Sequence, residues 1–208
     1  MLNGLDIPVT VEITADGGDH QSLEVAAHGR ATPEVSGMAT VKVTTSHGDL
    51  ISENKAQFGR PTGCKHIYSV MGAAAYVSED VQYGTGFGTP TSDVGTGELT
   101  EEECGVSFAF IDPPRAVTAD QYGPSGKNLR WLHYHGDGGW LVAVHELLDD
   151  HGPYASQRHG EAQRIVAAVV THDPTNPGLA EVKRRLTQMG LVVPAAQQGN
   201  LLADSERR

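Results

Sequence analysis

The sequence predicts an α+β protein whose β-rich N-terminal two-thirds form a sandwich or a small barrel-like antiparallel sheet, with a C-terminal αα-hairpin packed on it. Apolar and polar residues alternate in short stretches of the first half, which is the period of half-buried strands. The 25 glycines and 11 prolines suit many turns. Apolar residues in the last third recur at helical spacing. We expect a single domain over residues 1–194 and a polar tail over residues 195–208.

The first half of the chain contains three predicted strands. Isoleucine or valine occupies every second position of residues 7–14. An Ala-Asp-Gly-Gly-Asp turn follows, and the alternation resumes around Leu23 and Val25, which predicts a hairpin. Residues 39–45 form the third strand. The charged Glu-Asn-Lys stretch at residues 53–55 is predicted to be a loop. Three short strands in succession indicate a sandwich or barrel wall.

The middle of the chain is less regular. Residues 68–77 combine helix-favouring alanines with strand-favouring tyrosines and valines, and we expect a short helix there. Residues 84–97 have neither periodicity nor helix formers and are predicted to form a long loop. Residues 106–111 form a predicted buried strand, which the proline pair at residues 113–114 ends because it cannot continue a sheet ladder.

The last third has the clearest pattern. Residues 129–135 alternate as a strand does, whereas residues 140–148 fit both a strand and a helix. Residues 161–170 have one apolar helical face. A second helix over residues 176–190 has an asparagine cap, a proline at the first helical position, an apolar stripe and a glycine at the stop. These two helices are expected to form the αα-hairpin.

Charge and composition limit the class of partner. A formal net charge of −11, from 26 acidic and 15 basic residues, disfavours nucleic acid and anionic lipid. No stretch approaches the roughly 20 apolar residues of a membrane-spanning helix. The opening residues lack the pattern of a signal peptide, so we expect a cytoplasmic protein, or a virion protein if it is phage-encoded. Cys64 and Cys104 could pair, but there is no dense cysteine framework.

The strongest candidate for a metal-binding or catalytic site is a cluster of histidines and carboxylates. His133 and His135 are two residues apart on a predicted strand, so their side chains point to the same side, and Asp137 follows at the same interval. Such residues begin a zinc or iron site, which His145, Glu146 or the pair Cys64 and His66 would complete. A bound metal lowers the pKa of its water, so the alternative function is a small metal-dependent hydrolase.

Two metalloenzyme families share parts of this pattern. The His-x-His-x-Asp spacing resembles the metal motif of the metallo-β-lactamases, which adds a histidine where this chain has Gly138. The segment beginning at Trp131 resembles the Trp-x-His-x-His core of the JAMM metalloproteases, with Ala143 and Glu146 in the places of that family's serine and aspartate. The competing interpretation is that the histidines are packing residues among neighbouring aromatic side chains.

Cys64 is a second candidate. It follows a Pro-Thr-Gly turn and is predicted to begin the helix that contains Tyr68, where the helix dipole lowers a thiol pKa. This arrangement resembles papain-like cysteine hydrolases and arylamine N-acetyltransferases, which implies His133 or His135 as the base. Cys64 and Glu146 are therefore the candidate catalytic residues. A buried structural cysteine is the competing interpretation.

The leading prediction is a non-catalytic structural or interaction component of a larger assembly. It depends on the β-rich character, the long glycine and threonine loops and the lack of a complete catalytic motif. The polar tail is expected to lie against a neighbouring chain. This combination is typical of tail, neck or capsid-associated proteins of bacteriophage virions. We therefore expect no cofactor, and other protein chains as partners in a homo- or hetero-oligomer.

Overall fold

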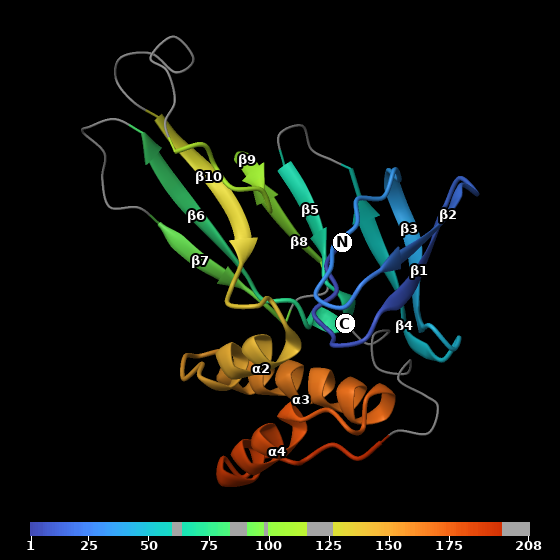
Figure 1. Ribbon diagram of the computed structural model, residues 1–208, viewed down its shortest axis with the longest axis vertical. Helices are drawn as coiled ribbons and strands as arrows, with labels where there is room; N and C mark the ends of the chain where they lie inside the picture. Colours follow the sequence, from blue (N-terminus) through green and yellow to red (C-terminus); the bar gives the residue numbers. More distant parts are fainter. Residues whose placement is uncertain (60–63, 84–90, 98–99, 116–126, 197–208) are drawn as a thin grey trace.

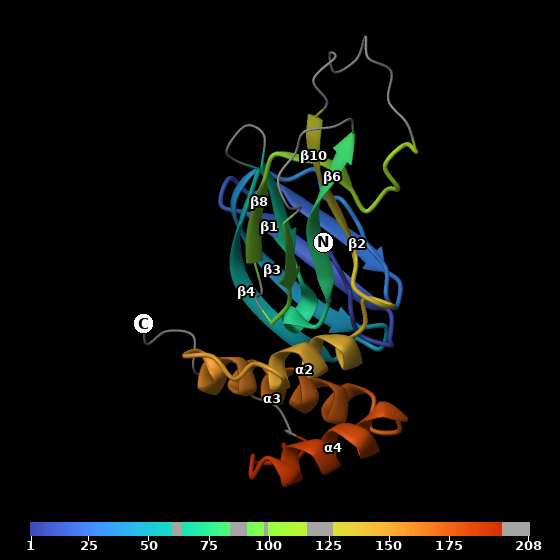
Figure 2. The ribbon, with the colours of Figure 1, turned by 90° about the vertical axis from the view of Figure 1, so that its left-hand side faces the viewer.

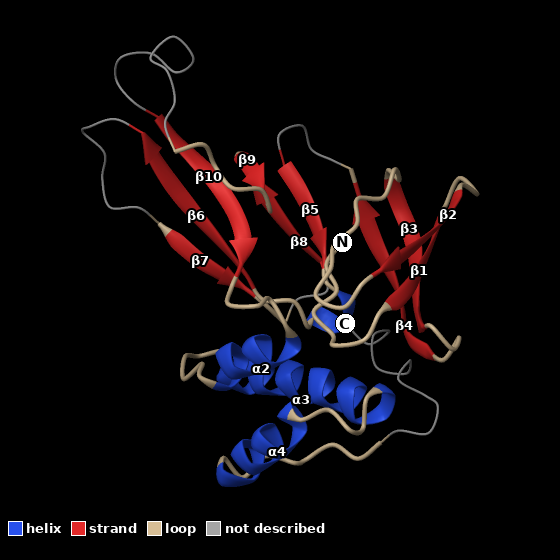
Figure 3. Ribbon diagram, in the orientation of Figure 1, coloured by secondary structure: helices blue, strands red, loops and turns tan. Residues whose placement is uncertain are grey.

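Three β-sheets lie on one side of a group of helices in the computed structural model (Figure 1). The structure describes residues 1–59, 64–83, 91–97, 100–115 and 127–196, so most of the predicted tail lies outside the described residues. Figure 3 shows that strands and helices occupy separate parts of the molecule. The antiparallel strands in the first two-thirds and the helices in the last third confirm the predicted α+β class.

The first sheet has the order β2-β1-β3-β4 and is antiparallel throughout. Its strands are β1 (Val9–Ala15), β2 (His20–Val25), β3 (Gly37–Thr45) and β4 (Leu50–Phe58). The three strands predicted in the first half of the chain are thus confirmed. Val11, Ile13 and Val41 are fully buried on the inner face, while Lys42 on the outer face pairs with Glu12 at 3.3 Å.

Strand β4 corrects the prediction of a charged loop at residues 53–55. Glu53 lies opposite Lys42 of β3 on the outer face. Ser52, Ala56 and Phe58 are buried. Ser52 is a polar residue on the inner face of the strand. It interrupts the alternation of apolar and polar residues from which a strand is predicted.

The second sheet has the order β7-β6-β10-β9. Its strands are β6 (Tyr76–Tyr83), β7 (Ser92–Gly95), β9 (Val106–Ala109) and β10 (Lys127–Tyr134). Strand β10 is antiparallel to β6 and parallel to β9. The strands predicted over residues 129–135 and 106–111 are confirmed, but the second is not buried: Val106, Phe108 and Ala109 are half-buried and Ile111 is exposed. The loop predicted over residues 84–97 is wrong where β7 forms, and residues 84–90 lie outside the described residues.

A third, two-stranded sheet pairs β5 (Cys64–Tyr68) with β8 (Thr100–Cys104). The helix predicted over residues 68–77 is wrong, because only the single 3-10 turn η1 (Val70–Gly72) forms between β5 and β6. Met71 and Gly72 have φ angles of 57° and 70°, a left-handed conformation that ends a helix. The alanines at residues 73–75 are fully buried, so their small size serves close packing instead of helix formation.

The helices are α2 (Trp140–Leu148), α3 (Ala155–His172) and α4 (Gly178–Gln188). Residues 140–148, which fit two patterns in sequence, are helical. Both end signals of the last helix are confirmed: Asn176 Oδ1 accepts a hydrogen bond from Gly178 N at 3.0 Å, and Gly190 has a φ of 69°. None of the helices in the described residues is long and apolar enough to cross a membrane.

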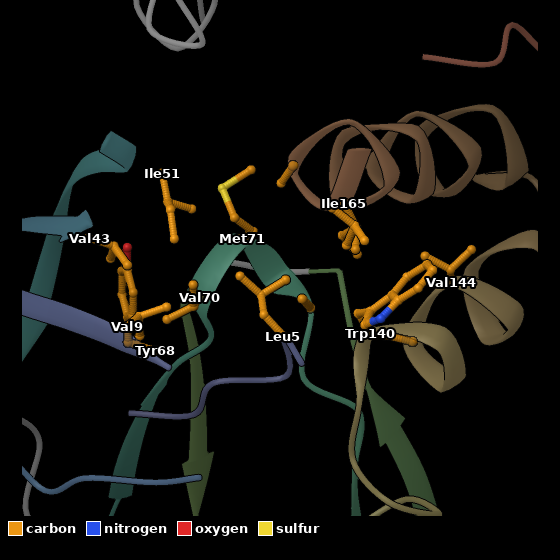
Figure 4. Close-up of a cluster of buried hydrophobic side chains, with 14 of the residues drawn as sticks. Leu5, Val9, Val43, Ile51, Tyr68, Val70, Met71, Trp140, Val144 and Ile165 are labelled. Atoms are coloured by element: carbon orange, nitrogen blue, oxygen red, sulfur yellow. The ribbon is translucent and has the colours of Figure 1, made fainter. Parts of the chain in front are cut away.

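One hydrophobic cluster joins the first sheet to the helices. Figure 4 shows sheet residues on one side, helix residues on the other, and Leu5, Val70 and Met71 between them. Helix α4 lies on the side of α2 and α3 that faces away from the sheets (Figures 1 and 2). A smaller cluster fills the space between the small sheet and the second sheet, and contains Leu2, Ile67, Ala74, Tyr76 and Leu132.

Candidate interaction groove

The predicted metal-binding histidines lie on β10 and just beyond it, and each has its own carboxylate partner. His133 stacks on Trp131, with ring centroids 4.0 Å apart, and its Nε2 lies 3.5 Å from Glu79 Oε1. His135 Nε2 lies 3.0 Å from Glu146 Oε1 on α2. Carboxylates from different elements therefore lie beside the two imidazoles, and only the contact of His135 with Glu146 is a hydrogen bond.

Asp137 and His145 make two further contacts. Asp137 Oδ1 accepts a hydrogen bond from Gly139 N at 2.9 Å, which closes the turn before α2. His145 Nε2 lies 3.2 Å from Glu181 Oε1 on α4. Across the described ranges, no three histidine, cysteine, aspartate or glutamate side chains gather in a way that could hold a metal. The zinc or iron site stays a prediction.

Cys64 is the first residue of strand β5, which corrects the prediction that it begins a helix. Its sulfur is bonded to that of Cys104, its register partner on β8. A disulfide-bonded cysteine has no thiolate to act as a nucleophile. The bond instead fixes one end of the small sheet.

Asp6 is the centre of a polar cluster that no sequence motif indicates. Its Oδ2 accepts hydrogen bonds from Trp140 Nε1 at 2.7 Å and from Asn176 Nδ2 at 2.6 Å, and its Oδ1 contacts His28 Nε2. His28 Nδ1 donates to the Asp137 carbonyl at 3.4 Å. The cluster ties the segment before β1 to the starts of α2 and α4.

Hydrogen bonds determine the charges in this cluster. Burial opposes ionisation of Asp6, but hydrogen bonds from Asn176, His28 and Trp140 outweigh it and lower the pKa of Asp6. Burial also opposes protonation of His28, but its bonds to Asp6 and the Asp137 carbonyl outweigh it and raise the pKa of His28. With both ring nitrogens engaged, His28 is suited to holding chain segments together and not to abstracting a proton.

A groove with a volume of about 310 Å³ runs beside β5. One wall consists of four consecutive residues at the start of β5, and the other comes from residues 30–33 and residue 35, before β3. Ala109, Phe110 and Leu132 of the second sheet contribute to its floor. Because side chains of a strand alternate between its two faces, a lining of consecutive residues indicates that the groove follows the strand's edge.

Residues 1–3, here called the N-terminal segment, close one end of the groove. Leu2 forms a parallel bridge with Ser69, just after β5. Leu2 N donates to the Tyr68 carbonyl at 2.8 Å, and the Leu2 carbonyl accepts from Val70 N at 3.0 Å. The N-terminal segment is thus a short added strand on the edge of β5, and it lies beside this strand in Figure 1.

The other side of the N-terminal segment is also paired. Asn3 N donates to the Gly29 carbonyl at 2.9 Å, and Ala31 N donates to the Met1 carbonyl at 3.1 Å. Burial, reinforced by the charge of Arg30, lowers the pKa of the Met1 α-amino group to about 6. The N-terminal segment therefore lies between two backbones, and the groove continues from its outer end.

The ionisable side chains that line the groove are basic. They are Arg30, Lys65 and His66, and no aspartate or glutamate is among the described lining residues. This contrasts with the net charge of −11 for the whole chain. Arg30 Nη1 donates to the Ala109 carbonyl at 2.9 Å, and its guanidinium lies 5.9 Å from the centre of the Phe110 ring. Lys65 is the register partner of Glu103 on β8, so an acidic residue lies beside this basic one, and the floor of the groove is apolar.

The floor contains a strained aromatic residue. Phe110 has a φ of 55°, which is unusual for a bulky side chain, and its ring lies 5.0 Å from that of Tyr134. The buried Tyr134 hydroxyl has no hydrogen-bond partner among the described residues. Burial raises the pKa of Tyr134, and the charge of Arg30 opposes this. Backbone strain and unpaired polar groups occur preferentially at functional sites.

Comparisons with family models, curated proteins and solved structures find no match. The functional argument therefore depends on the groove itself. Sequence reasoning missed Arg30, Lys65 and Phe110 because they lie in three separate stretches without a shared motif. His66 was considered only as a metal ligand. A basic residue in an acidic chain, such as Arg30 shortly before Pro33, is the only local signal.

Proposed function

We propose that this protein is a non-catalytic interaction component of a larger assembly, and that it binds a segment of another protein chain in the groove beside β5. The virion of a bacteriophage, built from tail, neck and capsid-associated proteins, is the kind of assembly that the sequence favours. The main support is that the groove follows a strand edge on which the N-terminal segment is already paired.

The position of the groove beside a strand supports a polypeptide ligand. Its volume is about 310 Å³. Its long direction follows β5, which has β8 as its only strand neighbour in the sheets of the described residues. A strand edge can pair with an added extended chain, which gains main-chain hydrogen bonds from one side and side-chain contacts from the groove.

The proposal predicts that the protein occurs in complexes. The natural protein would be purified under mild conditions from its source cells, and its mass measured by size exclusion with light scattering. We expect a mass well above the 22.1 kDa of one chain. A monomer in every fraction would contradict the proposal.

Thr32→Trp tests whether the groove carries this interaction. Thr32 is exposed and lines the groove, so an indole at this position occupies the space without entering the core. Thr14→Trp is the matched control, because Thr14 is exposed on β1 and does not line the groove. The complex should be lost in the first variant and retained in the second. A complex that survives in both would place the interaction elsewhere.

A further inference from the structure

We propose that the disulfide between Cys64 and Cys104 is a redox switch for the groove, because a thiol reductant would open the end of the small sheet that this bond closes. The bond joins the first residue of β5 to the last residue of β8. Cys64 itself lines the groove. The opening of the sheet follows from how its two ends are held, and the effect on a bound partner rests on the proposed function.

The two ends of the small sheet differ in burial. At the inner end, Ile67 and Tyr68 are only 6 % and 1 % exposed, and each belongs to one of the two hydrophobic clusters. The outer end, here called the tip, consists of residues 64–66 and their register partners 102–104. No side chain of the tip that the structure describes is buried. The hydrophobic core therefore holds the inner end and does not hold the tip.

Non-covalent contacts alone hold the tip once the disulfide is broken. A ladder of only two strands is marginally stable in water. Lys65 is the register partner of Glu103, but Lys65 is exposed, and an ion pair with an exposed lysine contributes little. Glu103 also accepts a hydrogen bond from Ser78 of β6 at 3.1 Å, which ties β8 to the second sheet. We therefore expect the two strands of the tip to separate on reduction, with β8 remaining beside the second sheet.

No short turn replaces the disulfide. The turn η1 and the strands β6 and β7 lie between β5 and β8, and the two cysteines are 40 residues apart in sequence. In a hairpin the turn keeps the strand ends together, whereas here the covalent link at the tip is the disulfide. Breaking it gives the strand ends the freedom of a long loop, which opposes their pairing.

A reductant can reach the bond in the folded protein, because Cys104 is exposed and Cys64 is half-buried at the groove. Exposed disulfides are more readily reduced than buried ones and are often regulatory. A dithiol attacks one sulfur as a thiolate, which breaks the S–S bond and forms a mixed disulfide. Its second thiol then displaces the cysteine. The protein gains two electrons and two protons as two thiols, and the dithiol leaves as a disulfide.

The groove depends on the tip for one of its walls. Three of the four β5 residues that line the groove belong to the tip, namely Cys64, Lys65 and His66. The opposite wall and the floor come from other parts of the chain, so they do not contain the bond. The groove is therefore complete only while the disulfide is intact. A partner would bind in oxidising surroundings and be released in reducing ones.

Hydrogen exchange of the full chain tests the switch. The oxidised protein is treated with dithiothreitol at neutral pH without denaturant, alkylated to count free thiols, and compared with untreated protein. We expect both thiols to appear while the amides of β1 and β3 stay protected, and exchange at the tip of β5 to accelerate about tenfold. Unchanged exchange at the tip, or thiols that appear only when β1 and β3 also exchange, would make the bond purely structural and overturn the proposal.

The double variant Cys64→Ser, Cys104→Ser separates the loss of the bond from other effects of the reductant. Its tip should exchange as fast as that of reduced wild type, with or without dithiothreitol. Purified from the source cells without reductant, it should elute as a single chain, whereas the control Thr14→Trp should remain in the complex. A tip as protected as that of oxidised wild type would contradict the switch.

The remaining outcomes distinguish the switch from the proposed function. If the double variant stays in a complex that Thr32→Trp abolishes, the bond does not control the groove, so the switch fails and the proposed function stands. A monomeric natural protein rejects the proposed function and the effect on a partner. It does not reject the opening of the tip, which hydrogen exchange measures without any partner.

Discussion

Asp6 connects parts of the chain that are far apart in sequence. Its carboxylate accepts hydrogen bonds from Trp140 and Asn176, which are 134 and 170 residues away. The same carboxylate contacts His28. Hydrogen bonds to a charged group are stronger than those between neutral groups, so each donor contributes measurably to stability.

Two substitutions of tryptophan by phenylalanine compare an indole that donates a hydrogen bond with one that does not. Trp140→Phe removes the hydrogen bond to Asp6 and should lower the free energy of unfolding by about 1.5–3 kcal/mol. Trp131 Nε1 has no hydrogen-bond partner among the described residues, so Trp131→Phe should cost less. Urea denaturation of both variants measures the difference. A larger loss in Trp131→Phe would contradict the role given to Asp6.

The charges of Asp6 and His28 predict a window of greatest stability. The pKa of Asp6 is lowered by folding, so its contribution is present above the unfolded pKa of about 4 and is lost as the pH falls through the folded pKa. The pKa of His28 is raised, so its contribution is present below the unfolded pKa of about 6.5 and is lost as the pH rises through the folded pKa. The contribution of this pair should be greatest between these two values.

Thermal denaturation of wild type and His28→Asn across pH measures this effect. The difference in Tm between them should be largest at about pH 5 and should shrink toward about pH 9. A difference that stays constant over this range would show that the charge of His28 does not stabilise the fold.

The paired histidines predict a low metal content. His133 and His135 lie beside carboxylates of different elements, and no set of three ligands gathers around either histidine among the described residues. Protein exposed to zinc and iron and then dialysed should retain well under one ion per chain in plasma mass spectrometry. About one ion per chain, lost in His133→Ala, would instead support the metal-dependent hydrolase.

Individual residues were predictable only where their role is local. Asn176 was identified as a cap because its partner, Gly178, is two residues away. Its second bond, to Asp6, could not be predicted, because only the complete fold brings the two side chains together. The same reason explains why His133 and His135 were grouped by their spacing, although their carboxylate partners lie on β6 and α2.

At the scale of elements, periodicity predicted the strands and helices that have one apolar face. Strands β1 and β3 and helices α3 and α4 follow their patterns closely. Residues 68–77 were misread because alanine favours helix in isolation, whereas here it permits close packing. A tertiary hydrogen bond is also made at this turn: Gly97 N donates to the Gly72 carbonyl at 3.0 Å.

Two glycine substitutions test this account of the η1 turn. Gly72 has a positive φ, and a Cβ added there would lie 2.3 Å from the Gly97 carbonyl oxygen. Gly72→Ala should therefore lower the free energy of unfolding by more than about 2 kcal/mol. Gly160 lies within α3 with nothing near its missing Cβ, so Gly160→Ala should stabilise the protein by about 0.5–1 kcal/mol. Denaturant titration of both variants measures these changes. Equal effects of the two substitutions on the free energy of unfolding would contradict the explanation.

At the scale of the whole molecule, the disulfide adds a covalent link to a fold that hydrophobic packing holds together. Cys64 and Cys104 are 40 residues apart, and closing a loop of this size contributes about 2–4 kcal/mol in the chain-entropy account. Disulfides persist in oxidising surroundings, unlike the reducing cytoplasm expected from the sequence. The compartment of the protein stays a prediction.

Reduction measures the contribution of this bond. The Tm of wild type should fall on adding a thiol reductant, whereas the double variant Cys64→Ser, Cys104→Ser should have a lower Tm that the reductant does not change. Equal Tm values for wild type and double variant without reductant would contradict the predicted stabilisation.

The overall class was predictable, but the groove was not. Short-range patterns are sufficient to separate a strand-rich part from a helical part. The groove needs the N-terminal segment, residues 30–33 and residue 35, strand β5 and the second sheet to meet in space. No sequence pattern in any of these stretches indicates that it contacts the others, so only the folded structure shows that they lie together.

The position of the N-terminal segment has a practical consequence for the handling of the protein. Any peptide joined ahead of Met1 would leave the segment at the outer end of the groove, alongside β5. A tether this short gives an effective concentration in the millimolar range, which outcompetes a free ligand of moderate affinity. A purification tag at this end would therefore act as a built-in competitor, whereas cleaving it would expose the edge of β5.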